Sequence, residues 1–120
     1  MLLDTHILLW FAGEPERLSS HAAAAIEDAD ECCVSFASAW EYGAKRAKFP
    51  KRLPKSFESL MAPHFRPLDI PFELYRFAES LPPIHHDPFD RMLMAQALAD
   101  DLTLVTADET IRSYPVATLW

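Results

Sequence analysis

The sequence lacks the features that would place a protein in a membrane or direct it out of the cell. No apolar run within the 120 residues approaches the roughly 20 residues that cross a bilayer. The N-terminus has no basic region followed by an apolar segment and a cleavage site, so no export signal is indicated. We therefore expect a cytoplasmic protein that makes no membrane contact.

Cysteine is also scarce. Cys32 and Cys33 are adjacent in an expected strand, where successive side chains point to opposite faces, so a disulfide between them would be strained. We expect both to be reduced packing residues. Half of the residues are apolar, and a chain of this length buries about two-thirds of its unfolded surface. The sequence therefore predicts one domain, residues 1–120, with a core that needs no disulfide.

Basic residues are few, with 11 Lys and Arg against 18 Asp and Glu and a formal net charge of −7. This balance argues against a protein that coats nucleic acid nonspecifically, because such binding draws on many phosphate contacts. It does not exclude a nuclease, since carboxylates gathered around divalent cations are largely neutralised. Six of the basic residues fall between Lys45 and Lys55, a segment that its prolines predict to be a loop.

Short apolar runs alternate with helical patterns along the whole chain. Strands are expected at residues 1–4, 32–36, 67–70, 102–107 and 116–119, with helical segments between them. Such alternation predicts a parallel sheet with helices on both faces and right-handed crossovers. The expected fold is therefore a three-layer α/β/α domain with a central sheet of about five strands.

Four acidic residues are predicted to share one edge of this sheet. Asp4 and Asp108 each follow a strand, while Glu41 and Asp90 are expected in the first turns of helices, the former after a cap at Ser38. In a doubly wound sheet these positions face the same rim, where ligands bind. Each acid has an ordinary alternative role, because Asp and Glu at helix starts complement free N–H groups and the helix dipole.

The capping role is favoured for one further acid, Asp87. Pro88 suits the first position of a helix, because its φ is already helical and its missing N–H needs no partner there. Asp87 is then the N-cap of a helix whose apolar stripe continues to Leu98.

Four crowded carboxylates without matching bases would repel one another, so cations are expected between them. Oxygen ligands favour Mg²⁺ or Mn²⁺, whereas Zn²⁺ would favour His or Cys. Such ions activate a water molecule and stabilise a leaving oxygen in the hydrolysis of a phosphodiester. The acids therefore predict metal-dependent phosphodiester hydrolysis.

The segments around these acids resemble the PIN-domain ribonucleases, and among them the VapC-like toxins of bacterial type II toxin–antitoxin pairs. The resemblance runs from end to end of the chain and is carried by four segments in register: MLLDTH at 1–6, SAWE at 38–41, HDPFDR at 86–91 with its continuation to 97, and VTAD at 105–108. It implies a PIN-like fold and a metal-dependent endoribonuclease that cleaves RNA. The catalytic, metal-binding acids that it implies are Asp4, Glu41, Asp90 and Asp108, with Thr5 and Thr106 as supporting hydroxyls.

The resemblance also implies a cognate antitoxin as partner, and we expect a homodimer. Apolar residues of the first helix, namely Ile7, Leu8, Trp10 and Phe11, are expected to be exposed and to receive an antitoxin segment as an amphipathic helix.

Positive charge is expected beside the acids to hold the RNA polyanion. Lys45 follows Glu41 by one helical turn and so falls on the same face. We expect Lys45, with Lys51 and Arg52 of the basic segment, to bind the phosphates that flank the scissile bond.

Two other functions remain open at this point. The His86-Asp87 doublet could belong to an HD-type metal phosphohydrolase, but such folds are helical and need further histidines, which His6, His21 and His64 do not convincingly supply. A non-catalytic binding module on the PIN scaffold is the second alternative. The presence of carboxylates at all four positions argues against it.

Overall fold

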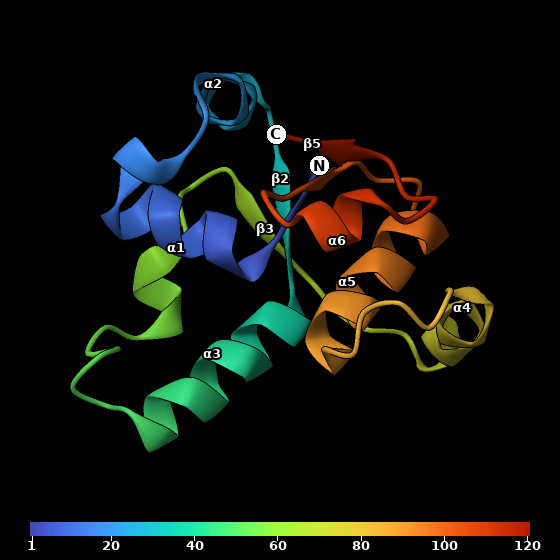
Figure 1. The fold of residues 1–120 in the computed structure, drawn as a ribbon. Helices are drawn as coiled ribbons and strands as arrows, with labels where there is room; N and C mark the ends of the chain where they lie inside the picture. Colours follow the sequence, from blue (N-terminus) through green and yellow to red (C-terminus); the bar gives the residue numbers. More distant parts are fainter.

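The computed structural model describes residues 1–120 and contains a five-stranded parallel sheet flanked by helices (Figure 1). The strand order is β3-β2-β1-β4-β5, so the first strand of the sequence is central in the sheet. The strands are β1 Leu2–Leu3, β2 Cys32–Ser35, β3 Phe65–Leu68, β4 Leu104–Val105 and β5 Thr118–Leu119. The predicted α/β/α class and parallel sheet are confirmed.

Helices connect the strands in every crossover. The α-helices are α1 Thr5–Gly13, α2 Ser20–Asp28, α3 Phe36–Lys48, α4 Tyr75–Ser80, α5 Pro88–Ala99 and α6 Glu109–Arg112. Three short 3₁₀ helices are η1 Pro15–Arg17, η2 Phe57–Leu60 and η3 Phe72–Leu74. None of these helices is long and apolar enough to cross a membrane.

The core consists of two apolar layers, one on each face of the sheet. Helices α4, α5 and α6 lie on one side of the sheet and α1 and α2 on the other (Figure 1). Leu2 packs in the layer of the first group, while the next residue, Leu3, packs in the layer of α1 and α2. Cys33 and Cys32 divide between the same two layers, and both are buried free thiols, as predicted. Alternation along each strand therefore supplies both faces of the sheet.

The order in which the strands are added reverses between β1 and β4, which makes this the switch point of the sheet. The chain runs outward from β1 through β2 to β3, and then crosses back to β4 on the other side of β1. Ligands of open parallel sheets bind at the carboxyl ends of the strands where the strand order reverses in this way. The residues that follow β1 and β4, including Asp4 and Asp108, lie at this point.

Helix α3 begins earlier than the sequence predicted. Ser35 is its N-cap and accepts a hydrogen bond from the N–H of Ala37 at 2.9 Å, whereas Ser38 is inside the helix. Both serines are good caps, and the tertiary fold selects the first. Glu41 consequently lies in the second turn and not in the first turn.

The same helix also ends later than predicted, at Lys48. Lys45 is therefore helical, as its one-turn spacing from Glu41 predicted, and the basic loop expected from the prolines begins only after Lys48. Pro50 has no N–H to continue the helical hydrogen bonds and disfavours the α region for Phe49 before it, which leaves the turn that ends at Lys48 intact. Lysine and arginine in this last turn complement the negative end of the helix dipole.

The apolar residues of α1 were also partly misjudged. Ile7 and Leu8 are completely buried, so they cannot receive a partner as expected, whereas Trp10 and Phe11 are partly buried. The helix is apolar almost all round, and its sequence does not indicate which side faces the sheet.

Candidate active site

Asp4 occupies the carboxyl end of the central strand and is almost completely buried, at 3% exposure. Its side chain makes no capping bond to α1, although the residue holds the N-cap position. Instead, Asp4 Oδ2 accepts a hydrogen bond from the hydroxyl of Thr106 at 2.8 Å. Asp4 Oδ1 has no hydrogen-bond partner although it is buried. An unpartnered buried carboxylate oxygen is costly, and a bound cation would satisfy it.

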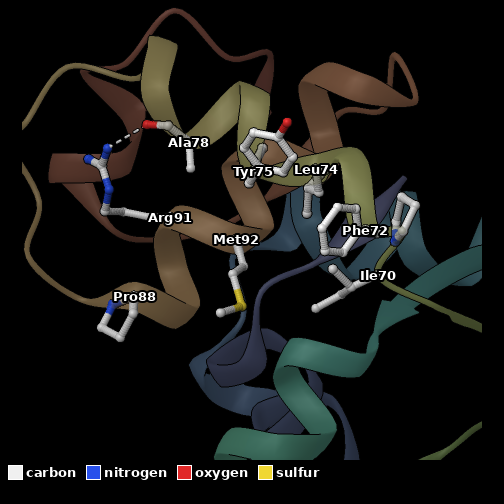
Figure 2. A pocket seen from close by; sticks show the side chains of 10 residues that line it. Ile70, Phe72, Leu74, Tyr75, Ala78, Pro88, Arg91 and Met92 are labelled. Atoms are coloured by element: carbon white, nitrogen blue, oxygen red, sulfur yellow. Dashed lines mark hydrogen bonds between the residues drawn. The ribbon is translucent and has the colours of Figure 1, made fainter.

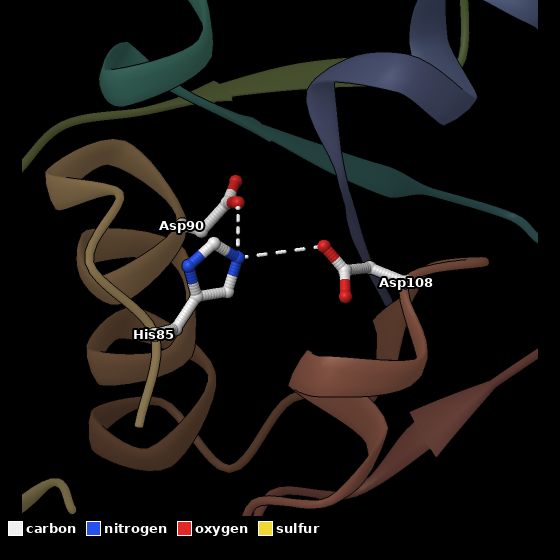
Figure 3. Close-up of side chains that lie close together, drawn as sticks. All are labelled: His85, Asp90 and Asp108. Carbon is white, nitrogen blue, oxygen red and sulfur yellow. Dashed lines mark hydrogen bonds and ion pairs between the residues drawn. The ribbon is translucent and has the colours of Figure 1, made fainter. Parts of the chain in front are cut away.

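The two carboxylate oxygens of Asp108 make different contacts. Oδ1 accepts hydrogen bonds from the N–H groups of Thr110 at 2.8 Å and Ile111 at 3.2 Å, which caps α6. Oδ2 faces the side chain of His85 at 3.4 Å (Figure 3). The capping alternative therefore describes Oδ1, while Oδ2 stays available for the predicted site.

Asp90 lies in the first turn of α5, on the side that faces Asp108 (Figure 3). Its Oδ2 is 2.9 Å from His85 Nε2, and the ligand atoms of the three residues lie within 4.8 Å of one another. Asp87, as predicted, is the N-cap of α5, and its Oδ1 accepts from the N–H groups of Phe89 and Asp90. The local helix start thus fixes where the Asp90 carboxylate is presented.

Glu41 is 4% exposed and projects from the second turn of α3. Its Oε2 is 3.1 Å from the ammonium of Lys45, one turn later on the same face. The lysine side chain is about half exposed, at 53%, so its charge is shared between Glu41 and solvent. The i,i+4 relation predicted between these residues is present.

The electrostatics of the acids show that they form one group. Burial, followed by the charges of Asp4 and Asp87, raises the pKa of Asp90 to about 7; His85 opposes this rise, while Glu41 adds to it. Burial also raises the pKa of Asp4, although the hydrogen bond from Thr106 lowers it. Perturbed carboxyl groups that repel one another at the switch point of a sheet are typical of functional sites.

The residues present fit a divalent metal ion. The unpaired Asp4 Oδ1 supplies a buried anionic oxygen, and Asp90 and Asp108 supply further carboxylates at the same edge. Hard oxygen donors with few nitrogen ligands suit Mg²⁺ or Mn²⁺. The roles of Asp4, Glu41, Asp90 and Asp108 as metal ligands stay a prediction.

The remaining predicted site residues differ in what they contact. Thr106 bridges Asp4 and the N–H of Asp108, whereas the hydroxyl of Thr5 donates to Ser38 at 2.8 Å. Lys51 and Arg52 follow α3 in an exposed turn, where the Arg52 guanidinium lies over the ring of Phe49. The basic residues that the sequence grouped together are thus divided between a helix and a turn.

Sequence reasoning missed His85, whose imidazole lies between two of the predicted acids (Figure 3). The residue stands in the segment that precedes α5, and only its neighbour His86 was considered there. A histidine two positions before an N-cap was the available signal. Its contact with Asp108 depends on a pairing across 23 positions, which local pattern does not show.

A separate apolar pocket of about 430 Å³ lies between α5 and the η3–α4 segment (Figure 2). Its lining includes Phe72, Tyr75 and Met92, all exposed. Arg91 directs its guanidinium away to the carbonyl oxygen of Ala78. The pocket holds none of the four acids, so it is distinct from the candidate site.

The fold and the acidic rim define a class of protein. Residues 1–117 match the family model of the PIN domain, and the chain belongs to this family. It is 36% identical over 118 residues to Ribonuclease VapC22 of Mycobacterium tuberculosis (strain ATCC 25618 / H37Rv), an alignment that covers 95% of this chain and 91% of that protein.

Solved structures share the fold at lower sequence identity. VapBC2 from Rickettsia felis, bound to a DNA fragment from its promoter, superposes with a TM-score of 0.72 at 14% identity, covering 98% of this chain and 96% of that chain. A toxin–antitoxin complex from Klebsiella pneumoniae gives a TM-score of 0.66 at 18% identity, with 99% and 95% covered. At these identities the likeness establishes the fold alone.

Proposed function

We propose that this chain is a divalent-metal-dependent endoribonuclease and the toxin of a type II toxin–antitoxin pair. The observation that carries the proposal is the carboxylate group around Asp4, whose Oδ1 is buried without a partner beside Asp90 and Asp108. The 36% identity to a protein named as a ribonuclease, across nearly the whole chain, supports the same reaction class.

Asp4, Glu41, Asp90 and Asp108 are the proposed holders of Mg²⁺ or Mn²⁺. The ion, when bound, supplies a water molecule of lowered pKa and positive charge for the phosphate oxygens. Thr106 orients Asp4 by donating to its Oδ2, which leaves Oδ1 without a protein partner and able to hold the ion.

The basic residues act on the RNA rather than on the ion. Lys45 projects beside Glu41 at the edge of the acidic group, where a phosphate of the substrate would otherwise meet only negative charge. Lys51 and Arg52 are exposed in the following turn and would bind phosphates further along the strand.

A cognate antitoxin is the proposed regulatory partner, and a second copy of the chain is the proposed structural partner. The solved neighbours include toxin–antitoxin complexes. Trp40 on α3 and Phe72 on η3 are 61% and 85% exposed, and each lies beside a second exposed aromatic ring, Phe36 and Tyr75 respectively. Grouped exposed apolar side chains favour a protein interaction surface. The proposed location is the cytoplasm, where such an enzyme meets RNA.

The test is RNA cleavage by the purified protein with and without Mg²⁺ or Mn²⁺. We expect cleavage only with metal, and its loss in Asp4→Asn, Glu41→Gln, Asp90→Asn and Asp108→Asn. Expression of the wild-type chain alone should arrest growth, and expression of Asp4→Asn should not. Full cleavage by Asp90→Asn would contradict the site, and harmless expression of an active, soluble protein would contradict the toxin assignment.

Two alternative functions are weighed against this proposal. The HD-type phosphohydrolase fails, because such folds are helical whereas this fold is built on a parallel sheet. A non-catalytic binding module would keep RNA binding without metal-dependent cleavage. The cleavage experiment separates this module from the proposed enzyme.

A further inference from the structure

His85 joins two carboxylates that come from distant parts of the chain. Its Nε2 lies 2.9 Å from Asp90 Oδ2 on α5 and 3.4 Å from Asp108 Oδ2 at the start of α6 (Figure 3). The imidazole side chain is 18% exposed, so solvent competes only weakly for these contacts. Either of two chemistries would fit this position: an imidazole that binds the metal ion, or an N–H group that holds the carboxylates.

The other ring nitrogen decides between them. His85 Nδ1 is 3.2 Å from the backbone nitrogen of Asp87, whose N–H donates to it. A backbone amide is always a donor, so Nδ1 must be the unprotonated nitrogen of a neutral ring. The ring proton is then on Nε2, which faces Asp90 and Asp108 as a donor and has no free lone pair for a metal ion.

The backbone of His85 is itself fixed by a residue 29 positions later. The hydroxyl of Tyr114 accepts hydrogen bonds from the N–H groups of both Ile84 and His85. Arg91 Nη1 also lies 3.4 Å from this oxygen. Tyr114 is only 4% exposed, so a side chain of the protein interior holds the segment that carries the imidazole.

We propose that His85 is a positioning residue, whose Nε2–H clamps the Asp90 and Asp108 carboxylates toward one another without being a ligand of the metal ion. This inference rests on the proposed metal-dependent function. A carboxylate has two oxygens with about four acceptor sites, so Asp90 and Asp108 keep the capacity to bind an ion while Oδ2 contacts Nε2–H. Without this clamp, like charges would separate, and ion binding would have to gather them again.

The first experiment compares metal affinity among matched variants. Binding of Mg²⁺ and of Co²⁺ is measured by titration calorimetry for wild type, His85→Phe, His85→Gln and the exposed neighbour variant His86→Phe. Removal of hydrogen-bonded support from metal-binding groups typically weakens affinity about 10- to 100-fold. We expect this loss in His85→Phe, partial recovery in His85→Gln, which can still donate from a side-chain amide, and no change in His86→Phe.

The comparison of the two ions separates positioning from ligation. Imidazole favours Co²⁺ over Mg²⁺, so removing an imidazole ligand would weaken Co²⁺ binding far more. A positioning residue should give the same fold-loss for both ions. A much larger loss for Co²⁺ would overturn the proposal in favour of a histidine ligand.

The second experiment reads the ring proton directly. Long-range ¹H–¹⁵N correlation spectra distinguish the two neutral tautomers, and the His85 signals are those missing from His85→Phe. We expect Nε2 to stay protonated in the metal-free and the Mg²⁺-saturated protein. A switch to the Nδ1-protonated form on Mg²⁺ binding would contradict the inference.

A third variant keeps the imidazole but loosens its support. Tyr114→Phe removes the hydroxyl that accepts from the N–H groups of Ile84 and His85, while the imidazole of His85 is unchanged. Its loss of Mg²⁺ affinity should be non-additive with that of His85→Phe, because both changes act through one group. Simple addition of the two losses would count against the clamp.

These outcomes also separate the inference from the function on which it rests. If wild type bound neither ion, the proposed function itself would fail. If wild type and His85→Phe bound Mg²⁺ equally, the positioning role alone would be excluded.

Discussion

The hydroxyl of Thr106 donates to Asp4 Oδ2 at 2.8 Å across 102 positions of sequence, and the oxygen of this hydroxyl accepts a hydrogen bond from the N–H of Asp108 at 3.1 Å. One hydroxyl therefore connects the acid after the central strand to the acid after its neighbour. Thr106 is completely buried, so this connection has no competition from water.

Replacing Thr106 tests this connection. Thr106→Val keeps the shape of the side chain but leaves the Asp4 carboxylate and the N–H of Asp108 without their partner. An unsatisfied buried group costs about 1–3 kcal/mol, so we expect a loss of this size in the free energy of unfolding. Because the hydrogen bond also lowers the pKa of Asp4, its removal should weaken metal binding most at acid pH.

Denaturant unfolding and metal titration of Thr106→Val at pH 6 and pH 8 would measure both effects. Thr106→Ser retains the hydroxyl and is the control. Wild-type stability in Thr106→Val would mean that the Asp4 carboxylate finds another donor.

The raised pKa of Asp90 predicts how stability depends on pH in the metal-free protein. Its folded pKa of about 7 exceeds the ordinary value of 3.8, so the folded state binds more protons between these values. Stability must then fall as pH rises from about 4 to about 7, and remain lowered above that range. The cause is the cost of an ionised Asp90 among other acids.

Asp90→Asn removes this cost, because the amide remains neutral. A pKa difference of one corresponds to about 1.4 kcal/mol, so we expect a gain on the order of 2–4 kcal/mol at pH 8 and a much smaller one at pH 4. Thermal unfolding in a chelator at both pH values measures the difference. Equal effects at pH 4 and pH 8 would show that Asp90 is already ionised at acid pH.

The start of α5 shows which features sequence predicts well. Asp87 as the cap and Pro88 as the first helical residue are local features, and the structure confirms both. The start of α3 shows the limit, because Ser35 and Ser38 are both competent caps, and packing chose between them. The cap at Ser35 in place of Ser38 puts Glu41 in the second turn of α3 and not in the first, yet Glu41 still lies near the other acids.

The residues that sequence misplaced depend on distant contacts. His85 reaches the acids because Tyr114 holds its backbone, and nothing near His85 in the sequence indicates that contact. Ile7 and Leu8 were expected at the surface, but α1 turns them toward the sheet. Local pattern predicts that a helix is present and which residues can cap it, while tertiary packing decides which cap is used and what each side chain contacts.

Asp87→Ala separates capping from metal binding. Removing an N-cap acid costs about 0.5–2 kcal/mol, and we expect this decrease in the free energy of unfolding, since two N–H groups lose their acceptor. Asp87→Asn, which can still accept, should recover most of it. Mg²⁺ affinity, measured by calorimetry, should fall only as far as the start of α5 shifts. Unchanged stability with abolished metal binding would instead make Asp87 a ligand.

The last prediction concerns the basic residues that follow Glu41. Lys45 projects beside the acids, and Lys51 and Arg52 are exposed in the next turn. Removing one side chain that binds a phosphate should reduce the slope of log affinity against log salt concentration by about 0.7 for single-stranded RNA. The measurement uses the Asp90→Asn protein, which should not cleave the RNA, across a salt series.

Comparison of single alanine variants then identifies the side chains that bind phosphate. Lys45→Ala should reduce the slope, as should at least one of Lys51→Ala and Arg52→Ala. Arg76→Ala, an equal change of charge at an exposed position of α4, is the control and should leave the slope unchanged. If all four variants gave the slope of the Asp90→Asn parent, these side chains would be solvated charges, and the RNA would be held by another surface. A reduction for Arg76 equal to that for Lys45 would indicate a general effect of net charge and not a phosphate bound beside the acids.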